Sequence, residues 1–390
     1  MVKPFQFARV PAIHFKNGII TELPKFAGLY GKKLIVVTGR NSFLTSHQAG
    51  KLFEDLKKAS VVWHTVTIPC EPSPEIIDQA VQRIGNEPID LVIGIGGGSA
   101  MDAGKAISAM LYKSDSVQIY LEGTGTKTHP GTKVPYIAVP TTSGTGSEAT
   151  KNAVISVVGK DGFKRSLRHD NFVPEIAMVD PGLTLNCPPD ITAASGMDCF
   201  TQLTEAYLST KSNPYTDALA FEGLKAIKSS LLRSCIDGSD MEARSGMSFA
   251  ALTSGICLAN AGLGAVHGFA SSIGARYTIP HGVICGTLMA SANEVNVKLL
   301  RKGNNAESLM KYATLGRLFL DKKEGSSDYF IDGFIDYLCQ VSEELKLSGL
   351  KSAGVRENDL RDICMETDCK NNPVKLTTEE LMEILTKRYV

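Results

Sequence analysis

The 390-residue sequence predicts an α/β N-terminal half followed by an all-α C-terminal half. Two observations predict this fold class. In the first half, short apolar runs typical of buried parallel strands alternate with segments that have helical spacing. After Asp180-Pro181-Gly182 the strand-like runs stop and long helical segments follow. We therefore expect a domain boundary at Gly182, with domains at 1–182 and 183–390.

The expected elements follow from local patterns. We expect strands at 33–38, 60–68, 89–94 and 136–139, where β-branched and other apolar residues are concentrated, and helices at 75–84 and 100–110. In the second half we expect helices at 193–208, 216–232, 242–259, 306–318 and 328–345. A capping box at Thr377 and Glu380 opens a last helix, which should run to Arg388. Strands that alternate with helices indicate an open α/β sheet.

The composition excludes several classes of protein. Hydrophobic residues make up 43% and charged residues 21%, as in soluble globular chains. With 41 basic and 41 acidic residues the net charge is zero, which argues against binding to nucleic acid or to a membrane surface. The uncharged stretch 245–275 is long enough to cross a bilayer, but its Ser, Thr, Asn, Gly and His content favours packed core helices.

The 9 cysteines are odd in number, irregularly spaced and without a CxxC pair. This usage is typical of reduced thiols rather than of a secreted disulfide framework. We therefore expect a soluble cytoplasmic protein.

Two polar loops each follow an expected strand. The first, 94–99 (GIGGGS), precedes an expected helix, where close backbone approach and a helix N-terminus suit a phosphate group. Taken alone it is also compatible with a plain tight turn. The second, 139–148 (VPTTSGTGSE), carries five hydroxyls and two glycines. Two such loops at the carboxyl ends of parallel strands would share one crevice, and together they predict a nucleotide site.

The helical half carries candidate metal ligands. Asp198 and Gln202 are four residues apart on an expected helix, so they lie on the same face. His267 lies within the uncharged stretch, and His281 follows fourteen residues later. A carboxylate and two imidazoles suit a divalent transition metal, although each His could instead be a hydrogen-bonded core residue. Spacing alone leaves both interpretations open.

Several of these segments together resemble one family. The segments 96–105 (GGGSAMDAGK), 140–148 (PTTSGTGSE), 266–268 (VHG) and 280–283 (PHGV) are similar to motifs of the iron-containing (group III) alcohol dehydrogenases, and 371–373 (NNP) resembles a C-terminal motif of that family. The resemblance covers nearly the whole chain. It implies a dehydroquinate-synthase-like fold, with an α/β nucleotide-binding domain, a helical domain and a cleft between them. It also implies reversible oxidation of a small alcohol with NAD or NADP, a divalent metal (Fe or Zn) and a homodimer.

The resemblance also assigns residues. It implies that the pyrophosphate side of the cofactor site contains Gly97, Gly98, Ser99 and Asp102. The remainder of the cofactor would meet Thr141, Thr142, Thr145, Asn152 and Lys164. The metal ligands and catalytic residues would be Asp198, His267 and His281, with Gln202 at the edge of the ligand set.

The residues that follow the first strand indicate the cofactor preference, because NAD users of the family often carry an acidic residue there. Here the matching residue is Gly39, followed by Arg40, Asn41 and Ser42. No carboxylate repels a 2′-phosphate there, so we expect NADP over NAD, with Gly39 and Ser42 at the cofactor. A plain turn with an exposed Arg is the alternative.

Two positions depart from the family pattern. Gln202 stands where relatives have an imidazole ligand, and Ser271 stands where a second His is common four residues after His267. A Gln oxygen can ligate a metal, but it is neutral and weaker than imidazole. The departures leave open a maleylacetate-reductase-like enzyme, a less favoured dehydroquinate-synthase-like lyase and a catalytically inactive nucleotide-binding homologue. Our leading hypothesis is a metal-dependent NAD(P)-linked alcohol dehydrogenase or aldehyde reductase.

Overall fold

The structure is a computed structural model that describes residues 2, 4–322 and 324–390. Its first half is built around a six-stranded parallel sheet with the strand order β1-β8-β5-β4-β2-β3. The strands are β1 (Ala12–Phe15), β2 (Lys33–Gly39), β3 (Val62–Ile68), β4 (Leu91–Gly96), β5 (Tyr136–Pro140) and β8 (Ile176–Val179). The central strands β4 and β5 are buried along their whole length, as their apolar sequences predict.

Helices cover both faces of this sheet. They are α1 (Leu23–Ala27), α2 (His47–Lys58), α3 (Pro74–Ile84) and α4 (Gly98–Met110). Alternate residues of β2 separate the two layers: Ile35 and Val37 belong to the apolar core shared with α3 and α4, whereas Leu34 and Val36 belong to the core shared with α1 and α2. This alternation is the two-residue period of a strand that is buried on both sides.

A separate antiparallel hairpin, β6 (Asn152–Val157) and β7 (Phe163–Arg168), extends from the sheet toward the helical half. It contacts both α4 and the helix α8 (Ala265–Arg276). The sequence analysis did not predict β1, β6, β7 or β8. Their half-exposed or very short apolar patterns give little periodic signal.

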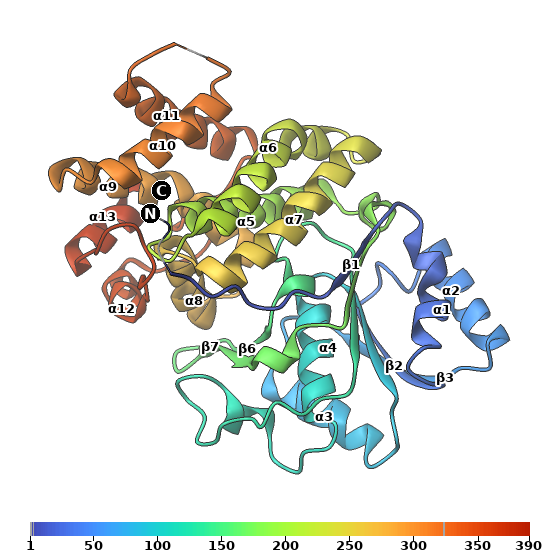
Figure 1. Ribbon diagram of the computed structural model, residues 1–390. Helices are drawn as coiled ribbons and strands as arrows, with labels where there is room; N and C mark the ends of the chain where they lie inside the picture. The colour runs from blue at the N-terminus through green and yellow to red at the C-terminus, as the bar shows by residue number, and fades with distance from the viewer. Residues whose placement is uncertain (1, 3, 323) are drawn as a thin grey trace.

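The second half is helical, and Figure 1 shows it packed beside the sheet domain. Its other helices are α5 (Pro189–Leu208), α6 (Pro214–Ile236), α7 (Met241–Ala261), α9 (His281–Lys302), α10 (Ala306–Phe319), α11 (Ser327–Glu344), α12 (Leu360–Glu366) and α13 (Thr378–Lys387). Short 3-10 turns are η1 (Ile19–Glu22), η2 (Val117–Tyr120), η3 (Ser147–Ala149), η4 (Asp170–Phe172), η5 (Pro181–Thr184) and η6 (Glu357–Asp359). The division at Gly182 falls inside η5, between the last sheet strand and α5, and the assignment of two domains stays a prediction.

The helices lie where local patterns place them, with two kinds of difference. Helix α5 begins at Pro189 and α6 ends at Ile236, each four residues beyond the expected limit. No range was predicted for α1, α2, α8, α9 or α12, and in α9 the glycines and β-branched residues weaken the helical signal. The capping box at Thr377 and Glu380 is formed at the start of α13, as predicted.

The uncharged stretch 245–275 forms most of α7 and α8. Across the described residues, no individual helix is long and apolar enough to cross a membrane; α7 and α8 pass that test only as a pair, with a bend of 98° between them. Figure 1 also shows the N-terminal segment crossing the helical half before it enters β1. Phe5 packs edge-on against Tyr215 of α6, and the backbone N–H of Ala8 donates to Asn260 Oδ1 at 2.6 Å.

Candidate functional site

A cavity with a volume of about 510 Å³ lies between the two halves. Its walls come from α4, the loop after β5, the hairpin β6–β7 and the helices α5, α8 and α9. Most of the predicted site residues line it: Gly98, Ser99, Asp102, Thr145, Asn152, Lys164, Asp198, Gln202, His267 and His281. The fold therefore brings six of the expected cofactor residues and the four expected metal ligands into one space, whereas Gly39, Ser42, Gly97, Thr141 and Thr142 do not line it.

The glycine loop forms one end of this space. Gly97 caps α4 without a side-chain hydrogen bond, so the first N–H groups of the helix face outward. A Cβ on Gly97 would lie 3.3 Å from Thr142 Oγ1, and a Cβ on Gly98 would lie 2.7 Å from Thr145 Cγ2. Glycine is thus needed at position 98 for loop packing, and at position 97 the absence of a side chain leaves backbone open to a phosphate.

A second, smaller cavity of about 90 Å³ lies on the other side of the loop. It is lined by Ser42, Thr141 and Thr142, together with η5 and the start of α5. Gly39 ends β2 next to Gly96, and a Cβ built on it would meet nothing within 4 Å. Since Thr142 faces Gly97 from the small cavity and Thr145 faces Gly98 from the large one, the glycine loop separates two adjoining spaces.

A buried charge network holds the two polar loops together. Lys105 Nζ donates to the carbonyl oxygens of Ser147 and Asn152 and to the Thr150 hydroxyl, at 2.7 to 3.0 Å. Asp102 accepts from Ser147 Oγ at 2.5 Å and from the Val154 N–H at 3.0 Å. Asp102 was predicted at the pyrophosphate side; its carboxylate is engaged by loop and hairpin, which indicates that it shapes the cofactor site.

Two members of this network titrate far from their ordinary ranges. Burial lowers the pKa of Lys105 to about 8, against the attraction of Asp102 and Glu148. Burial also raises the pKa of Glu148, which is 1% exposed, to about 7. The sequence analysis assigned no role to Lys105 or Glu148, because their buried, paired state appears only in the fold.

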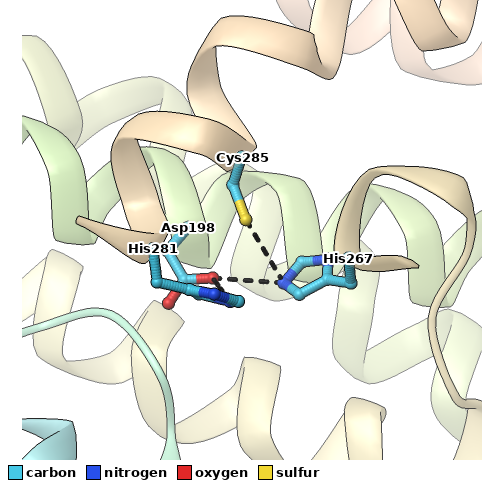
Figure 2. A group of neighbouring side chains, drawn as sticks. All are labelled: Asp198, His267, His281 and Cys285. Carbon is cyan, nitrogen blue, oxygen red and sulfur yellow. Dashed lines mark hydrogen bonds and ion pairs between the residues drawn. The ribbon is translucent and has the colours of Figure 1, made fainter. Parts of the chain in front are cut away.

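The metal-ligand candidates Asp198, His267 and His281 also line this cavity, and Figure 2 shows their side chains close together. His267 Nε2 lies 3.1 Å from Asp198 Oδ1, and His281 Nε2 lies 3.7 Å from the same oxygen. Cys285 joins them, and one ligand atom from each of the four side chains lies within 4.8 Å of the others. They come from three helices: Asp198 from α5, His267 from α8, and His281 and Cys285 from α9.

Glu205 fixes the orientation of His267. Its carboxylate lies 2.7 Å from His267 Nδ1 and accepts the Val266 N–H at 2.7 Å. An imidazole that donates Nδ1–H to a carboxylate presents the lone pair of Nε2, which is the arrangement found around metal-bound histidines. Glu205 was missed by the sequence analysis, although it follows Asp198 by seven residues and so shares its helix face.

Gln202 lies beside this cluster with its amide nitrogen directed at Asp198. Its Nε2 donates to Asp198 Oδ1 at 3.2 Å and lies 3.5 Å from the carbonyl oxygen of Gly144. Its buried Oε1 has no hydrogen-bond partner, and neither does Nδ1 of His281. Among the described residues, these two buried polar atoms therefore have no hydrogen-bond partner.

The two histidines differ in their titration. Burial lowers the pKa of His281 to about 4, which keeps its imidazole neutral. For His267 burial acts in the same direction, but Cys285, Asp198 and Glu205 outweigh it and raise the pKa well above 6.5. Burial opposes the charged form of Asp198, yet the two imidazoles hold its pKa below 3.8. The cluster thus keeps a carboxylate close to two imidazoles.

Lys164 extends from β7 into the cavity, where it is paired with a residue that the sequence analysis missed. Its Nζ lies 2.6 and 2.8 Å from the two carboxylate oxygens of Glu71, which also accepts from Ser156. Hydrogen bonds and attraction from Lys164 outweigh burial and lower the pKa of Glu71. Glu71 lies in the loop after β3, at the carboxyl edge of the sheet, and that position is the signal that could have found it.

The side chains in this cluster fit a divalent transition metal. A carboxylate, two imidazoles and a thiol are donor types that bind such ions, and they converge within 4.8 Å. The Glu205 carboxylate supports His267 at Nδ1, as carboxylates do at metal-bound histidines, and Gln202 Oε1 and His281 Nδ1 are buried beside the cluster without partners.

Comparison with known proteins agrees with this arrangement. The family model "Iron-containing alcohol dehydrogenase" matches residues 11–181, and the model "Fe-containing alcohol dehydrogenase family, C-terminal" matches residues 192–389. The long-chain-alcohol dehydrogenase 1 of Geobacillus thermodenitrificans is 40% identical over 274 residues, which are 70% of this chain and 68% of that protein. Alcohol dehydrogenase 4 of Saccharomyces cerevisiae is 30% identical over 365 residues, 92% of this chain and 91% of that protein.

Solved structures show the same fold. An alcohol dehydrogenase from Oenococcus oeni superposes with a TM-score of 0.89 at 29% identity, covering 99% of this chain and 100% of the other. A 1,3-propanediol oxidoreductase superposes with a TM-score of 0.88 at 27% identity, with the same coverage. By its sequence relatives, its two family models and its fold, this chain belongs to the iron-containing alcohol dehydrogenases, oxidoreductases that act on CH–OH groups with NAD(P) and a divalent metal.

Proposed function

We propose that this chain interconverts a small alcohol and its aldehyde by hydride transfer with NAD(P), and that Asp198, His267 and His281 hold one divalent metal at the reaction centre. The observation that carries the proposal is that a carboxylate and two imidazoles converge at one end of the 510 Å³ cavity whose other end is a glycine loop on a helix N-terminus. A cofactor held at the glycine loop would share this cavity with the metal cluster.

The residues of the chain have separate tasks in this scheme. When bound, the nicotinamide carries the hydride and the metal acts as a Lewis acid toward the alcohol or carbonyl oxygen. Glu205 holds the His267 ring so that Nε2 faces the cluster. Gly97 and Gly98 admit the pyrophosphate to the backbone N–H groups of α4, and Lys164, steadied by Glu71, contributes a positive charge to the cavity.

Ser271 is not suited to act as the base for the alcohol proton. Its hydroxyl donates to the backbone carbonyl of His267 at 3.0 Å, one turn back in α8. Ser271 is exposed and lines the cavity, so water has access to this side of the site. We infer that the proton passes to solvent there, in place of the second His of the family pattern.

We infer that NADP is preferred to NAD. Ser42 lines the small cavity at the adenosine side, and Gly39 and Arg40 lie at the end of β2 without a carboxylate side chain. A relative from Clostridium saccharobutylicum is named an NADPH-dependent butanol dehydrogenase, and one from Bacillus methanolicus an NAD-dependent methanol dehydrogenase, so relatives use either cofactor. The ratio of kcat/KM for NADPH and NADH tests this preference; a ratio below one contradicts it.

We also infer a homodimer. β1 is an edge strand, and its apolar side chains Ile13 and Phe15 are 40% and 37% exposed. An edge strand with exposed apolar side chains favours pairing with a strand of another chain. Pairing of this edge with a second copy would satisfy its free backbone N–H and C=O groups and place a second strand beside both side chains. Analytical ultracentrifugation should show a dimer that Ile13→Lys converts to monomer; a monomeric wild-type protein would contradict the inference.

A cytoplasmic location is part of the same proposal. The 9 cysteines are all free, which suits a reducing compartment. Fractionation of the source cells with a specific antibody tests this location.

The central experiment combines metal removal with a ligand variant. Chelated protein should lose alcohol oxidation with NADP and regain it on addition of Fe²⁺ or Zn²⁺, and His267→Ala should abolish both metal binding and turnover. A panel of short and long alcohols, with maleylacetate as a control, would define the substrate. Full turnover by protein in which elemental analysis finds no metal would overturn the proposed role of the cluster.

A further inference from the structure

Cys285 lies next to the proposed metal ligands Asp198, His267 and His281. Cys285 follows His281 by four residues, so both side chains lie on one face of α9. In Figure 2 its Sγ points toward His267, and it lies 3.8 Å from His267 Nε2. Nε2 is the same nitrogen that faces Asp198 at 3.1 Å, so sulfur, nitrogen and oxygen surround one small volume.

Gln202 does not fill the coordination position that the imidazole of relatives occupies. It directs its Nε2, an N–H donor without a lone pair for a metal, toward Asp198 Oδ1 at 3.2 Å. Even with the amide reversed, its oxygen would be a neutral donor, whereas a thiolate is anionic and soft. Cys285 therefore offers the strongest donor left in the cluster.

The location of Cys285 leaves the substrate side open. Asp198, His267 and His281 line the 510 Å³ cavity, but Cys285 does not, and it is fully buried behind them in the apolar core of α8, α9 and α12. A thiolate in that position would hold the ion from the protein side. Substrate oxygen would then reach it from the cavity.

We propose that Cys285, as a thiolate, is the fourth protein ligand of the metal and that this donor set selects zinc over iron. On binding, the S–H bond of Cys285 breaks, its proton passes to solvent and a sulfur–metal bond forms. An Asp-His-His-Cys set combines hard and soft donors, and thiolate favours Zn²⁺ or Co²⁺ over Fe²⁺. Gln202 then orients Asp198 through its hydrogen bond. This inference rests on the proposed metal site.

The first test is spectroscopic. The chelated full-length protein is loaded with Co²⁺, whose bonds to thiolate absorb in the near ultraviolet and whose d–d bands in the visible report the ion itself. The wild type should show both sets of bands. Cys285→Ser should lose the thiolate band, keep the visible bands and bind Co²⁺ about 10- to 100-fold more weakly. The matched control is Cys364→Ser, which removes another buried thiol from the same apolar core and should retain the band.

The second test needs no variant. X-ray absorption at the zinc edge of the wild-type holoenzyme should show one sulfur at ~2.3 Å besides nitrogen and oxygen at ~2.0–2.1 Å. Anaerobic dialysis against equal Zn²⁺ and Fe²⁺ should yield zinc-loaded wild type, with the zinc-to-iron ratio lowered at least about tenfold in Cys285→Ser.

The outcomes separate this inference from the proposed function. Co²⁺ bound with visible bands but without a thiolate band, or a zinc shell of nitrogen and oxygen alone, overturns the role of Cys285 and leaves the metal site standing. A wild type that takes up neither Co²⁺ nor Zn²⁺ overturns both. A thiolate band that persists in Cys285→Ser and disappears in Cys364→Ser also overturns the assignment.

Discussion

The glycine-loop end of the cavity is built mainly from backbone, whereas the metal end is built from side chains that three helices bring together. At the loop end, polar groups such as Lys105 and Asp102 are fully engaged with loop and hairpin. At the metal end, Gln202 Oε1 and His281 Nδ1 are buried without partners. At the first end the charged side chains are paired within the chain and the free groups are backbone N–H groups of α4, whereas at the second end the unpaired polar atoms belong to side chains.

This difference explains where the chain departs from its family. The loop end keeps both glycine motifs, and the Lys105 and Asp102 side chains of the first motif are hydrogen-bonded to Ser147 of the second. The metal end has changed one ligand position to Gln202, and Cys285 stands within reach of the same cluster. A site made of separate side chains can exchange one donor for another, since the fold does not depend on any single one of them.

The largest expected effect comes from blocking the backbone at the loop end. Gly97→Val adds a side chain where a phosphate would approach the N-terminus of α4, and its Cβ would lie 3.3 Å from Thr142 Oγ1, so that the Thr142 side chain must shift slightly. Loss of the charge-assisted bonds should weaken cofactor binding more than about 100-fold, since each such bond is worth ~1.5–3 kcal/mol. Fluorescence titration with NADPH measures the affinity.

The control for this variant is its metal content. Circular dichroism and bound metal should match the wild type, because the metal end does not depend on position 97. Unchanged cofactor affinity in a folded Gly97→Val protein would contradict the assignment of the loop to phosphate.

A smaller effect is expected at the metal end from Glu205→Gln. The amide keeps the shape of Glu205 but loses the carboxylate that lies 2.7 Å from His267 Nδ1. Loss of a carboxylate that supports a metal-binding histidine lowers metal affinity about 10- to 100-fold. Competition with a chromophoric chelator measures the affinity, and NADPH binding should remain unchanged. If metal affinity were unaffected, Glu205 would serve only to hold the Val266 N–H.

Gly39→Asp should shift the cofactor preference by about tenfold, because a carboxylate at the end of β2 repels a 2′-phosphate and accepts hydrogen bonds from a free ribose hydroxyl. The site has room for the new side chain, since a Cβ there meets no atom within 4 Å. The measurement is kcat/KM with NADPH and NADH in wild type and variant. If the ratio of kcat/KM for NADPH to that for NADH were the same in the two proteins, the ribose 2′ position of the cofactor would not lie near the end of β2.

The same contrast explains what could be predicted from sequence. The glycine loops are contiguous in the chain, so their chemistry and their place after β4 and β5 could be read locally. Asp198 and His267 are 69 residues apart, and the packing of both α5 and α8 against α9 brings them to 3.1 Å. Their pairing therefore rested on resemblance. Cys285 follows His281 by four residues, and that spacing would have indicated its face had α9 been expected as a helix.

Helices and strands with a weak hydrophobic periodicity were not predicted, for a related reason. The hairpin β6–β7 is only partly buried, and α9 carries Gly282 and Gly286, each packed against α5. Glycines lower helix propensity, so tertiary packing rather than local preference decides that α9 is a helix. The elements that build the contact between the two halves were therefore the hardest to predict.

The smallest effect on turnover is expected from Glu148→Gln, because Glu148 lines neither cavity. Its effect should instead appear in the pH dependence of stability. Burial raises the pKa of Glu148 from 4.5 to about 7 in the folded protein. Between these two values the folded state keeps a proton that the unfolded state releases, so the contribution of Glu148 to stability falls as the pH rises through this window. Urea unfolding of chelated protein from pH 4.5 to 7.5 should show wild type losing stability relative to Glu148→Gln up to pH 7 and no further above it. Parallel curves would mean that Lys105 keeps Glu148 charged throughout, and the loop end would then hold an ion pair in place of a neutral acid.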